Sequence, residues 1–381
     1  MPALLIFVMA CGLSPNFASL LVFRFIGGLC GSPGLTLASA TIADLFEPGR
    51  ARGVALFCYY SMPWLGSVLA PLIGFLVVAE KTWEWTQWVF LFIAVPIVLP
   101  GLALLRESKQ SVLDKRASRA RQLSMDERKD SRGLLSRISD SLATVPQYVQ
   151  SSLLRPLSML FTELIVGLVC LYAGFNFGLI CALVIVFPDI FAAAYSFNEV
   201  QQGLAFLGLI VGCILGPALL IADGELIERK KRGRVDHEKQ SSTDKLSPEV
   251  RLHGAMIGAV LLPTGLIIFA WTARPGISFL VPIFASTLIT LGALTIYVST
   301  PAYVVDVYGP RYGASANAAS SISRYTLAAA IPLFILQMYD GLGVGWATSV
   351  LALCAVIMLP IPFCFYRWGP QIRSRCMYQT E

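Results

Sequence analysis

Long apolar segments recur along the whole chain, and they constrain the fold more than any other feature of the sequence. Nine of them reach the roughly 20 residues that a helix needs to cross about 30 Å of hydrocarbon, and a shorter one opens the chain. Inside lipid, backbone N–H and C=O groups have to be paired within the protein, so each segment is predicted to be a helix. The predicted fold class is therefore an all-α polytopic membrane protein with about ten transmembrane helices. The segments are 3–13, 17–45, 51–78, 85–105, 157–191, 203–222, 253–272, 278–305, 314–338 and 343–366.

The composition excludes the main soluble classes. Apolar residues make up 56% of the 381 residues and charged residues 14%, whereas soluble domains have roughly 45–50% apolar and about 25% charged residues. A single soluble domain, a disordered chain and a secreted disulfide scaffold are all incompatible with these proportions.

Metal, cofactor and enzyme signatures are missing from the sequence. Eight of the nine cysteines lie in apolar segments, no CxxC occurs, and His237 and His253 are not spaced with any cysteine as metal ligands. No nucleophile elbow or P-loop is present either. We therefore predict no metal, no cofactor and no enzymatic activity. A membrane-embedded enzyme is disfavoured as well, because the spans hold no cluster of His or Asp.

The basic residues predict the orientation. Of the 29 Lys and Arg residues, 11 lie in 106–155 and eight in 229–251, and with ten spans both segments fall on one side together with the carboxy-terminal tail. The opposite side holds only Lys81 and Arg274. Loops rich in Lys and Arg stay in the cytoplasm, so both termini and both long loops are predicted to be cytoplasmic.

The longest polar segment also predicts the domain organisation. Residues 1–105 are expected to form a four-helix bundle, 106–155 a cytoplasmic linker, and 156–381 a six-helix bundle with the basic loop 229–251. The basic segments have no interleaved aromatic residues for stacking on bases, so nucleic acid is not a predicted partner. The lipid bilayer and its anionic headgroups are the better partner for these charges.

Two stripes of small residues indicate close helix contacts. Gly27, Gly28 and Gly31 follow Arg24 in one segment, and glycines of this spacing let a neighbouring helix approach closely. In the next segment the small residues recur every four positions, which places them on one helix face beside a proline that removes a backbone hydrogen bond. These residues are Gly66, Ala70, Pro71 and Gly74.

Together these motifs resemble the major facilitator superfamily. Arg24 with Gly28, and Gly66 with Ala70, Pro71 and Gly74, resemble signatures of its fourth helix and of the "antiporter" motif in its fifth, with Ala70 in place of the usual glycine. Other stretches narrow the likeness to the fungal drug:proton antiporter branch, which includes polyamine and cycloheximide-resistance exporters. These are 83–88, 160–163, 203–208, 312–316 through Arg324, 343–347, and 360–363 ahead of Tyr366.

The resemblance implies a fold of twelve helices, of which this chain has about ten. The sequence starts inside what resembles the third helix, so the first two helices of the family are expected to be missing. An arrangement of four plus six helices then corresponds to the six plus six of the family.

The resemblance also implies a function. The chain is expected to export small organic molecules such as drugs, toxins or fungal secondary metabolites by proton antiport, as a monomer in the plasma membrane. Charged residues inside the membrane are costly and point to function, so Arg24, Glu163 and Arg324 are the candidates for proton coupling. Each has a second interpretation: Arg24 extends to the interface, Glu163 caps or gates a helix, and Arg324 lines the cavity or pairs with a carbonyl. The candidates for the substrate cavity are Tyr172, Phe175, Asn176, Tyr297 and Asn317.

Two alternatives to this function remain at this point. In the first alternative, the chain is an inactive truncated remnant or a non-transporting partner protein. The missing helices favour this alternative. Alternatively it exports polyamines, but cationic polyamines favour an acidic cavity, and the predicted spans hold almost no carboxylates.

Overall fold

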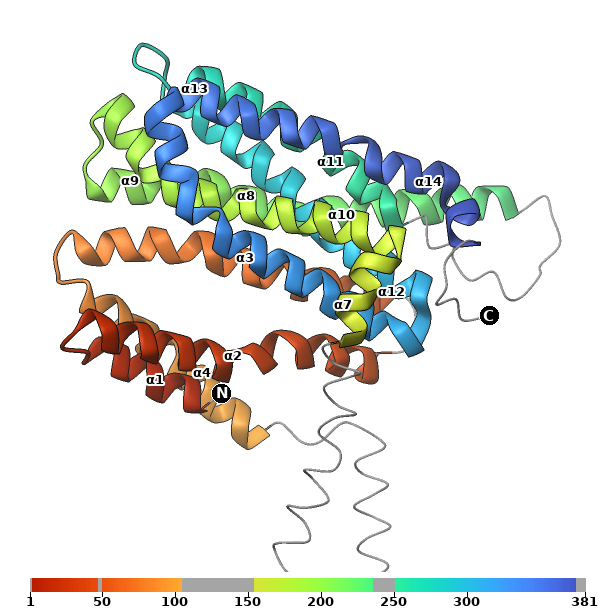
Figure 1. Cartoon of the computed structure of the whole chain (residues 1–381), viewed down its shortest axis with the longest axis horizontal. Coiled ribbons are helices and arrows are strands. Elements are labelled where there is room, and N and C mark those ends of the chain that lie inside the picture. The colour runs from red at the N-terminus through yellow and green to blue at the C-terminus, as the bar shows by residue number, and fades with distance from the viewer. Residues whose placement is uncertain (1, 47–49, 105–153, 236–250, 375–381) are drawn as a thin grey trace, which may run out of the picture. The chain divides into compact units, whose positions relative to one another are not determined.

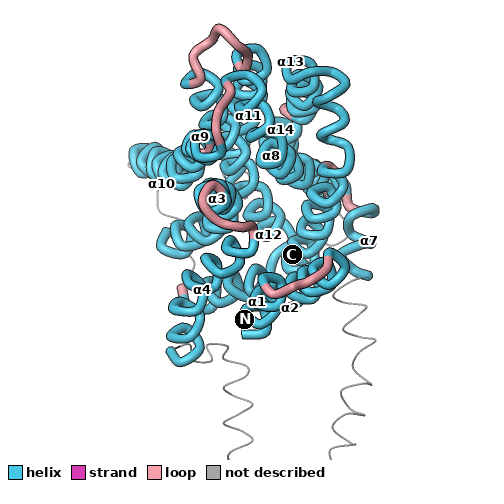
Figure 2. Tube along the Cα trace, turned by 90° about the vertical axis from the view of Figure 1, so that its left-hand side faces the viewer, coloured by secondary structure: helices cyan, strands magenta, loops and turns pink. Residues whose placement is uncertain are grey.

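The computed structural model describes residues 2–46, 50–104, 154–235 and 251–374. All regular elements in these residues are helices (Figures 1 and 2), which confirms the predicted all-α class. The helices are α1 (Pro2–Gly12), α2 (Phe17–Leu45), α3 (Arg50–Val78), α4 (Glu84–Leu104), α7 (Arg155–Thr162), α8 (Leu164–Tyr195), α9 (Glu199–Ala205), α10 (Leu207–Val235), α11 (Leu252–Thr272), α12 (Leu280–Ala330), α13 (Pro332–Met358) and α14 (Pro360–Arg373).

The chain divides into two compact units. The first comprises Met1–Tyr59 and Ile73–Ala143, and the second comprises Tyr60–Leu72 and Thr144–Glu381. The middle of α3 thus groups with the carboxy-terminal helices. The predicted linker at 106–155 lies, apart from its last two residues, outside the described residues, so the three-part domain organisation stays a prediction.

Length and hydropathy qualify seven stretches of the described chain as membrane spans, fewer than the ten predicted. Pro2–Gly12 and the first part of α2, Phe17–Ser32, are shorter apolar helical stretches, although α2 itself continues to Leu45. The predicted span 314–338 does not qualify, because it contains Arg324 and several serines and is divided at Ile331, between α12 and α13. The qualifying stretches are Gly53–Val78, Glu84–Gly101, Leu164–Tyr195, Glu199–Leu226, Leu252–Thr272, Leu280–Gly309 and Pro332–Arg373.

Two glycines interrupt α12 and α13. Gly309 (φ 62°, ψ −170°) interrupts α12, and Gly343 (φ 74°, ψ 163°) interrupts α13. Positive φ is strained for residues with a Cβ, so glycine is the residue that permits each kink. α10, in contrast, continues to Val235 as a helix through the start of the predicted basic loop 229–251, of which 236–250 lie outside the described residues.

In the second unit α12 packs against α8, α10 and α11, and α11 also packs against α13. Glycines bring these helices together. A Cβ added at Gly212 of α10 would lie 2.6 Å from the Thr287 carbonyl oxygen of α12, and one added at Gly292 of α12 would lie 2.6 Å from the Leu262 nitrogen of α11. The Thr287 hydroxyl donates a hydrogen bond of 2.9 Å to the carbonyl oxygen of Gly208, as is common where helices approach closely in membranes.

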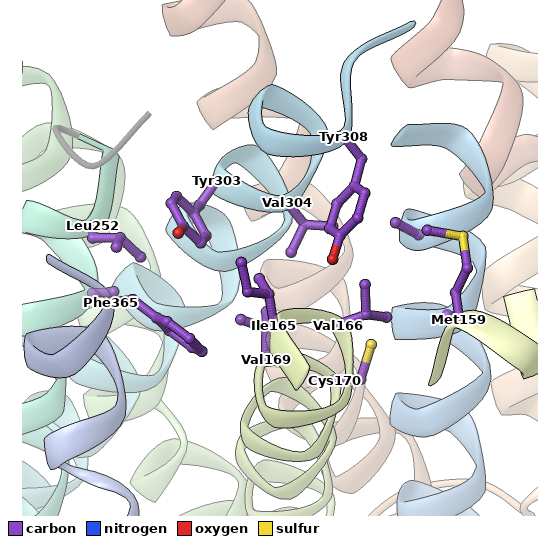
Figure 3. Close-up of a cluster of buried hydrophobic side chains, with 13 residues drawn as sticks. Met159, Ile165, Val166, Val169, Cys170, Leu252, Tyr303, Val304, Tyr308 and Phe365 are labelled. Atoms are coloured by element: carbon purple, nitrogen blue, oxygen red, sulfur yellow. The ribbon is translucent and has the colours of Figure 1, made fainter. Parts of the chain in front are cut away.

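A buried apolar cluster joins α7, α8, α11, α12 and α14 near the starts of α8 and α11 (Figure 3). Ile165 and Val169 of α8 meet Tyr303 of α12 and Phe365 of α14, and the rings of Tyr303 and Phe365 stack with centroids 6.0 Å apart. This cluster fixes the position of the chain just before α8, where Glu163 lies.

Candidate functional site

Arg324 is a buried cation in the second unit, near the middle of the stretch between the kinks at Gly309 and Gly343. Its side chain is held on two sides: Nη2 donates a hydrogen bond of 2.9 Å to the Ser321 hydroxyl, and Cζ lies 5.0 Å from the ring centroid of Tyr297. The residue is only 6% exposed, and Nη1 has no hydrogen-bond partner among the described residues. Among the residues the structure describes, no carboxylate forms an ion pair with Arg324.

Tyr297, the ring that lies over this cation, belongs to a cluster of aromatic rings from three segments of the chain. Tyr297 lies 5.1 Å from Trp64 and 6.2 Å from Phe177 between centroids, and it stacks on Phe177. Tyr60 meets the edge of Tyr297 at 6.3 Å, and Tyr325 meets that of Phe177 at 5.9 Å. Such offset and edge-to-face pairs add stability beyond the area they bury. These five residues form the ring cluster: Tyr60, Trp64, Phe177, Tyr297 and Tyr325.

The ring cluster has a buried side and an open side. Trp64 is 1% exposed and lies at its base, whereas Tyr325 is 48% exposed. Tyr60 and Phe177 are partly exposed as well. A planar molecule therefore has an aromatic surface to pack against at the edge formed by Tyr325.

Two asparagines add polar atoms around the cluster. The backbone oxygen of Asn317 accepts a hydrogen bond of 3.1 Å from the same Ser321 hydroxyl that binds Arg324. Asn176 is buried and donates to the Ala293 carbonyl oxygen at 2.9 Å. The side-chain oxygens of both asparagines are buried and have no partner within the described ranges, so each can accept a hydrogen bond from a ligand.

The structure unites some of the predicted cavity residues and separates others. Tyr297 and Asn317 lie at Arg324. Tyr172 is buried, and its hydroxyl has no partner in the described structure. Phe175 is partly buried on the same helix, α8. Within the described parts of the chain, neither makes a ring contact with the ring cluster.

Several residues of this site were not predicted from the sequence. Tyr60 and Trp64 on α3 and Ser321 and Tyr325 on α12 were assigned no role. Their spacing offers a weak signal, because Tyr60 and Trp64 are four residues apart and Ser321 is three before Arg324, which places each pair on one helix face.

Glu163 lies away from Arg324, at the break between α7 and α8. Its backbone is extended (φ −102°, ψ 114°), so it ends one helix and precedes the next. The carboxylate is 3% exposed and accepts a hydrogen bond of 3.0 Å from the Tyr308 hydroxyl. Figure 3 shows the Tyr308 side chain extending from α12 toward the start of α8. The Glu163 carboxylate thus links α7, α8 and α12.

The remaining predicted residues lie in less enclosed places. Arg24 is exposed on α2. A Cβ added at Gly27 or Gly31 would lie 3.5–3.6 Å from Phe7 or Leu4 of α1, an ordinary contact distance. Gly28 is exposed, and a Cβ there would meet nothing within 4 Å.

The proline-bearing stripe of α3 is also open. Gly66 and Ala70 are exposed, and Pro71 and Gly74 are partly buried. A Cβ at Gly66 or Gly74 would meet no atom within 4 Å in the described structure. The tight helix contacts lie instead at the glycines of α10, α11 and α12, which were assigned no packing role from the sequence.

The sequence has many known relatives. A profile of the Major Facilitator Superfamily matches residues 1–332. The MFS-type transporter phm3 of Pyrenochaetopsis is 35% identical over 97% of this chain and 74% of its own length. The efflux pump radE of Floropilus chiversii is 32% identical over 99% of this chain and 68% of its own. Polyamine transporter 4 of Saccharomyces cerevisiae is 29% identical over 99% of this chain and 59% of its own length.

Solved structures share the fold. The proton:xylose symporter XylE superposes with a TM-score of 0.61 over 96% of this chain and 79% of its own, at 14% identity. The human organic anion transporter MFSD10 superposes with a TM-score of 0.59 over 96% of this chain and 75% of its own, at 18% identity. These likenesses bear on the fold alone. Because the profile covers most of the sequence and phm3 aligns along nearly all of it, the chain belongs to the Major Facilitator Superfamily, whose members are membrane transporters and not enzymes.

Proposed function

We propose that this protein exports small organic molecules, such as drugs, toxins or secondary metabolites, in exchange for protons. The observation that carries the proposal is the ring cluster around the buried Arg324: an aromatic surface with a few polar groups suits bulky amphipathic molecules better than sugars. The names of the relatives radE and FUB11, both efflux pumps, point in the same direction. In transporters of this superfamily, two helical halves open a central site alternately to the two sides of the membrane.

Glu163 is the proposed proton carrier. An arginine keeps its proton in proteins, so Arg24 and Arg324 can act on a proton only through another group. A carboxylate can take up and release one. Glu163 is buried and bonded to Tyr308, so a change in its protonation changes the contact between the start of α8 and α12.

Uptake into inside-out membrane vesicles tests both parts of the proposal. With an acidic interior, vesicles containing the protein should accumulate at least one of three dyes: fluorescein (anionic), Nile red (neutral) or rhodamine 6G (cationic). A protonophore should abolish this accumulation. Glu163→Gln should reduce it to the level seen without a proton gradient, because the amide cannot carry a proton. The matched control is Glu199→Gln, since Glu199 is exposed at the start of α9.

Each contrary outcome has its own meaning. Gradient-driven uptake that is unchanged in Glu163→Gln would leave Glu163 with a structural role at the α7–α8 break. Failure to move any dye at matched membrane levels would favour an inactive remnant or a non-transporting partner. Preferential transport of spermidine would favour a polyamine exporter, as the name of one relative suggests; the buried positive charge of Arg324 opposes it.

The proposed location is the plasma membrane, with the protein as a monomer and both termini in the cytoplasm. The cytoplasmic position of the termini is supported by the 11 basic residues, of 29 in the chain, that lie between 106 and 155. A glycosylation acceptor inserted into this segment should stay unmodified in a eukaryotic membrane, and one inserted beside Lys81 should be glycosylated. The reverse pattern would invert the topology.

A further inference from the structure

We propose that Arg324 binds an acidic group of the transported molecule, so that the preferred substrates are organic anions with an aromatic or other planar apolar body. This inference rests on the proposed function and narrows its substrate class. The relevant part of the guanidinium is Nη1, which has no hydrogen-bond partner in the described structure.

The chain supplies Arg324 with one neutral partner and one ring. Nη2 donates to the Ser321 hydroxyl, the Tyr297 ring lies over the guanidinium carbon, and Nη1 donates to no atom in the part of the chain that the structure describes. A buried charge is costly unless it is paired, and a hydroxyl and a ring face compensate a full positive charge only in part. Arginine cannot relieve this cost by losing its proton.

A ligand carboxylate would complete the site. The planar guanidinium presents parallel N–H groups that match the two oxygens of a carboxylate or another oxyanion, and such bonds are stronger than those between neutral groups. A cationic ligand would meet repulsion at the same place. A neutral ligand would leave the charge of Arg324 uncompensated, so the site discriminates by charge.

The rings define the rest of the ligand. Phe177 and Tyr297 stack on each other, and Tyr325 extends the aromatic surface to the exposed edge of the ring cluster. Nη1 itself is covered, so a ligand reaches it only after a neighbouring side chain moves. An acid on a flat apolar body therefore fits both parts of the site.

The test compares three probes that share one ring system. Binding of 2-naphthoate, 2-naphthamide and 2-naphthylmethylammonium to the purified full chain in lipid nanodiscs is measured at pH 7, where the acid is ionised. One charge-assisted hydrogen bond gives a preference of about tenfold or more for naphthoate over the amide. Arg324→Gln should abolish this preference. Arg324→Lys should weaken it, because lysine keeps the charge but lacks the planar fork.

Arg274→Gln is the matched control, because Arg274 is exposed between α11 and α12, and it should leave the preference unchanged. Equal or tighter binding of the amide or the amine to the unmodified protein would overturn the inference, as would an undiminished preference in Arg324→Gln. If Arg324→Gln does not fold, Arg324→Lys decides: a weakened preference supports the inference and an unchanged one contradicts it.

The binding assay separates this inference from the proposed function. A preference for naphthoate that depends on Arg324, together with vesicles that move no dye, would contradict only the transport proposal. Proton-driven uptake of rhodamine 6G or Nile red by a protein that does not prefer naphthoate would contradict only the inference about Arg324.

Discussion

Replacing Gly212 by alanine is expected to destabilise the helices of the second unit, whereas the same replacement at Gly224, farther along the same helix, is expected to stabilise α10 slightly. The new methyl group at Gly212 would lie 2.6 Å from the Thr287 carbonyl oxygen and 2.9 Å from Thr290 Cβ. The nearest of these atoms is backbone, so α12 has to shift to accept it. Overpacking of this kind costs about 1–3 kcal/mol.

Gly224 provides the control for the Gly212→Ala substitution. It is exposed on α10, and an added Cβ there would meet nothing within 4 Å. Alanine at an unhindered helix position gains about 0.5–1 kcal/mol over glycine. Thermal unfolding of the purified variants in detergent should therefore give a lower melting temperature for Gly212→Ala and an equal or higher one for Gly224→Ala. Equal melting temperatures for Gly212→Ala and the unmodified protein would refute the close contact between α10 and α12.

Trp64→Ala should abolish transport. Trp64 is 1% exposed and lies 5.1 Å from Tyr297 and 6.1 Å from Phe177 between ring centroids, so it supports the ring that packs on Arg324. Its removal leaves a cavity at the base of the ring cluster, and such truncations of buried tryptophan cost about 3–5 kcal/mol. With Tyr297 free to tilt into that cavity, Arg324 loses the face that orients it.

The measurement is dye uptake at matched membrane levels, alongside the melting temperature. Trp83→Ala is the control, because Trp83 is exposed in the segment before α4, and it should transport normally. Trp64→Phe should recover part of the activity, since a smaller ring still contacts Tyr297. Normal uptake by Trp64→Ala would show that transport does not depend on the contact of Trp64 with Tyr297.

Part of this picture is already present in the sequence. Apolar segments of spanning length identify a helical membrane protein, and the residues around Arg24 and Pro71 identify its family. Charged residues inside apolar segments, such as Glu163 and Arg324, can also be recognised in the sequence, because a charge within the membrane is costly and therefore rare. The glycines at 208, 212 and 216 carry a readable signal as well, since their spacing of four puts them on one face of α10.

The sequence could not supply the partners of these residues. In a soluble helix the apolar stripe marks the buried face, but in a membrane helix the faces toward lipid and toward other helices are both apolar. Hydropathy therefore finds the span without finding its orientation. Only the tertiary structure decided that Glu163 meets Tyr308, that residues 60–72 of α3 join the second unit, and that Arg324 packs on Tyr297 with one nitrogen unpaired. Glu163 and Tyr308 are far apart in the chain, and Arg324 and Tyr297 lie on opposite sides of the kink at Gly309. Hydropathy does not encode contacts of this kind, because it does not show which helix faces meet.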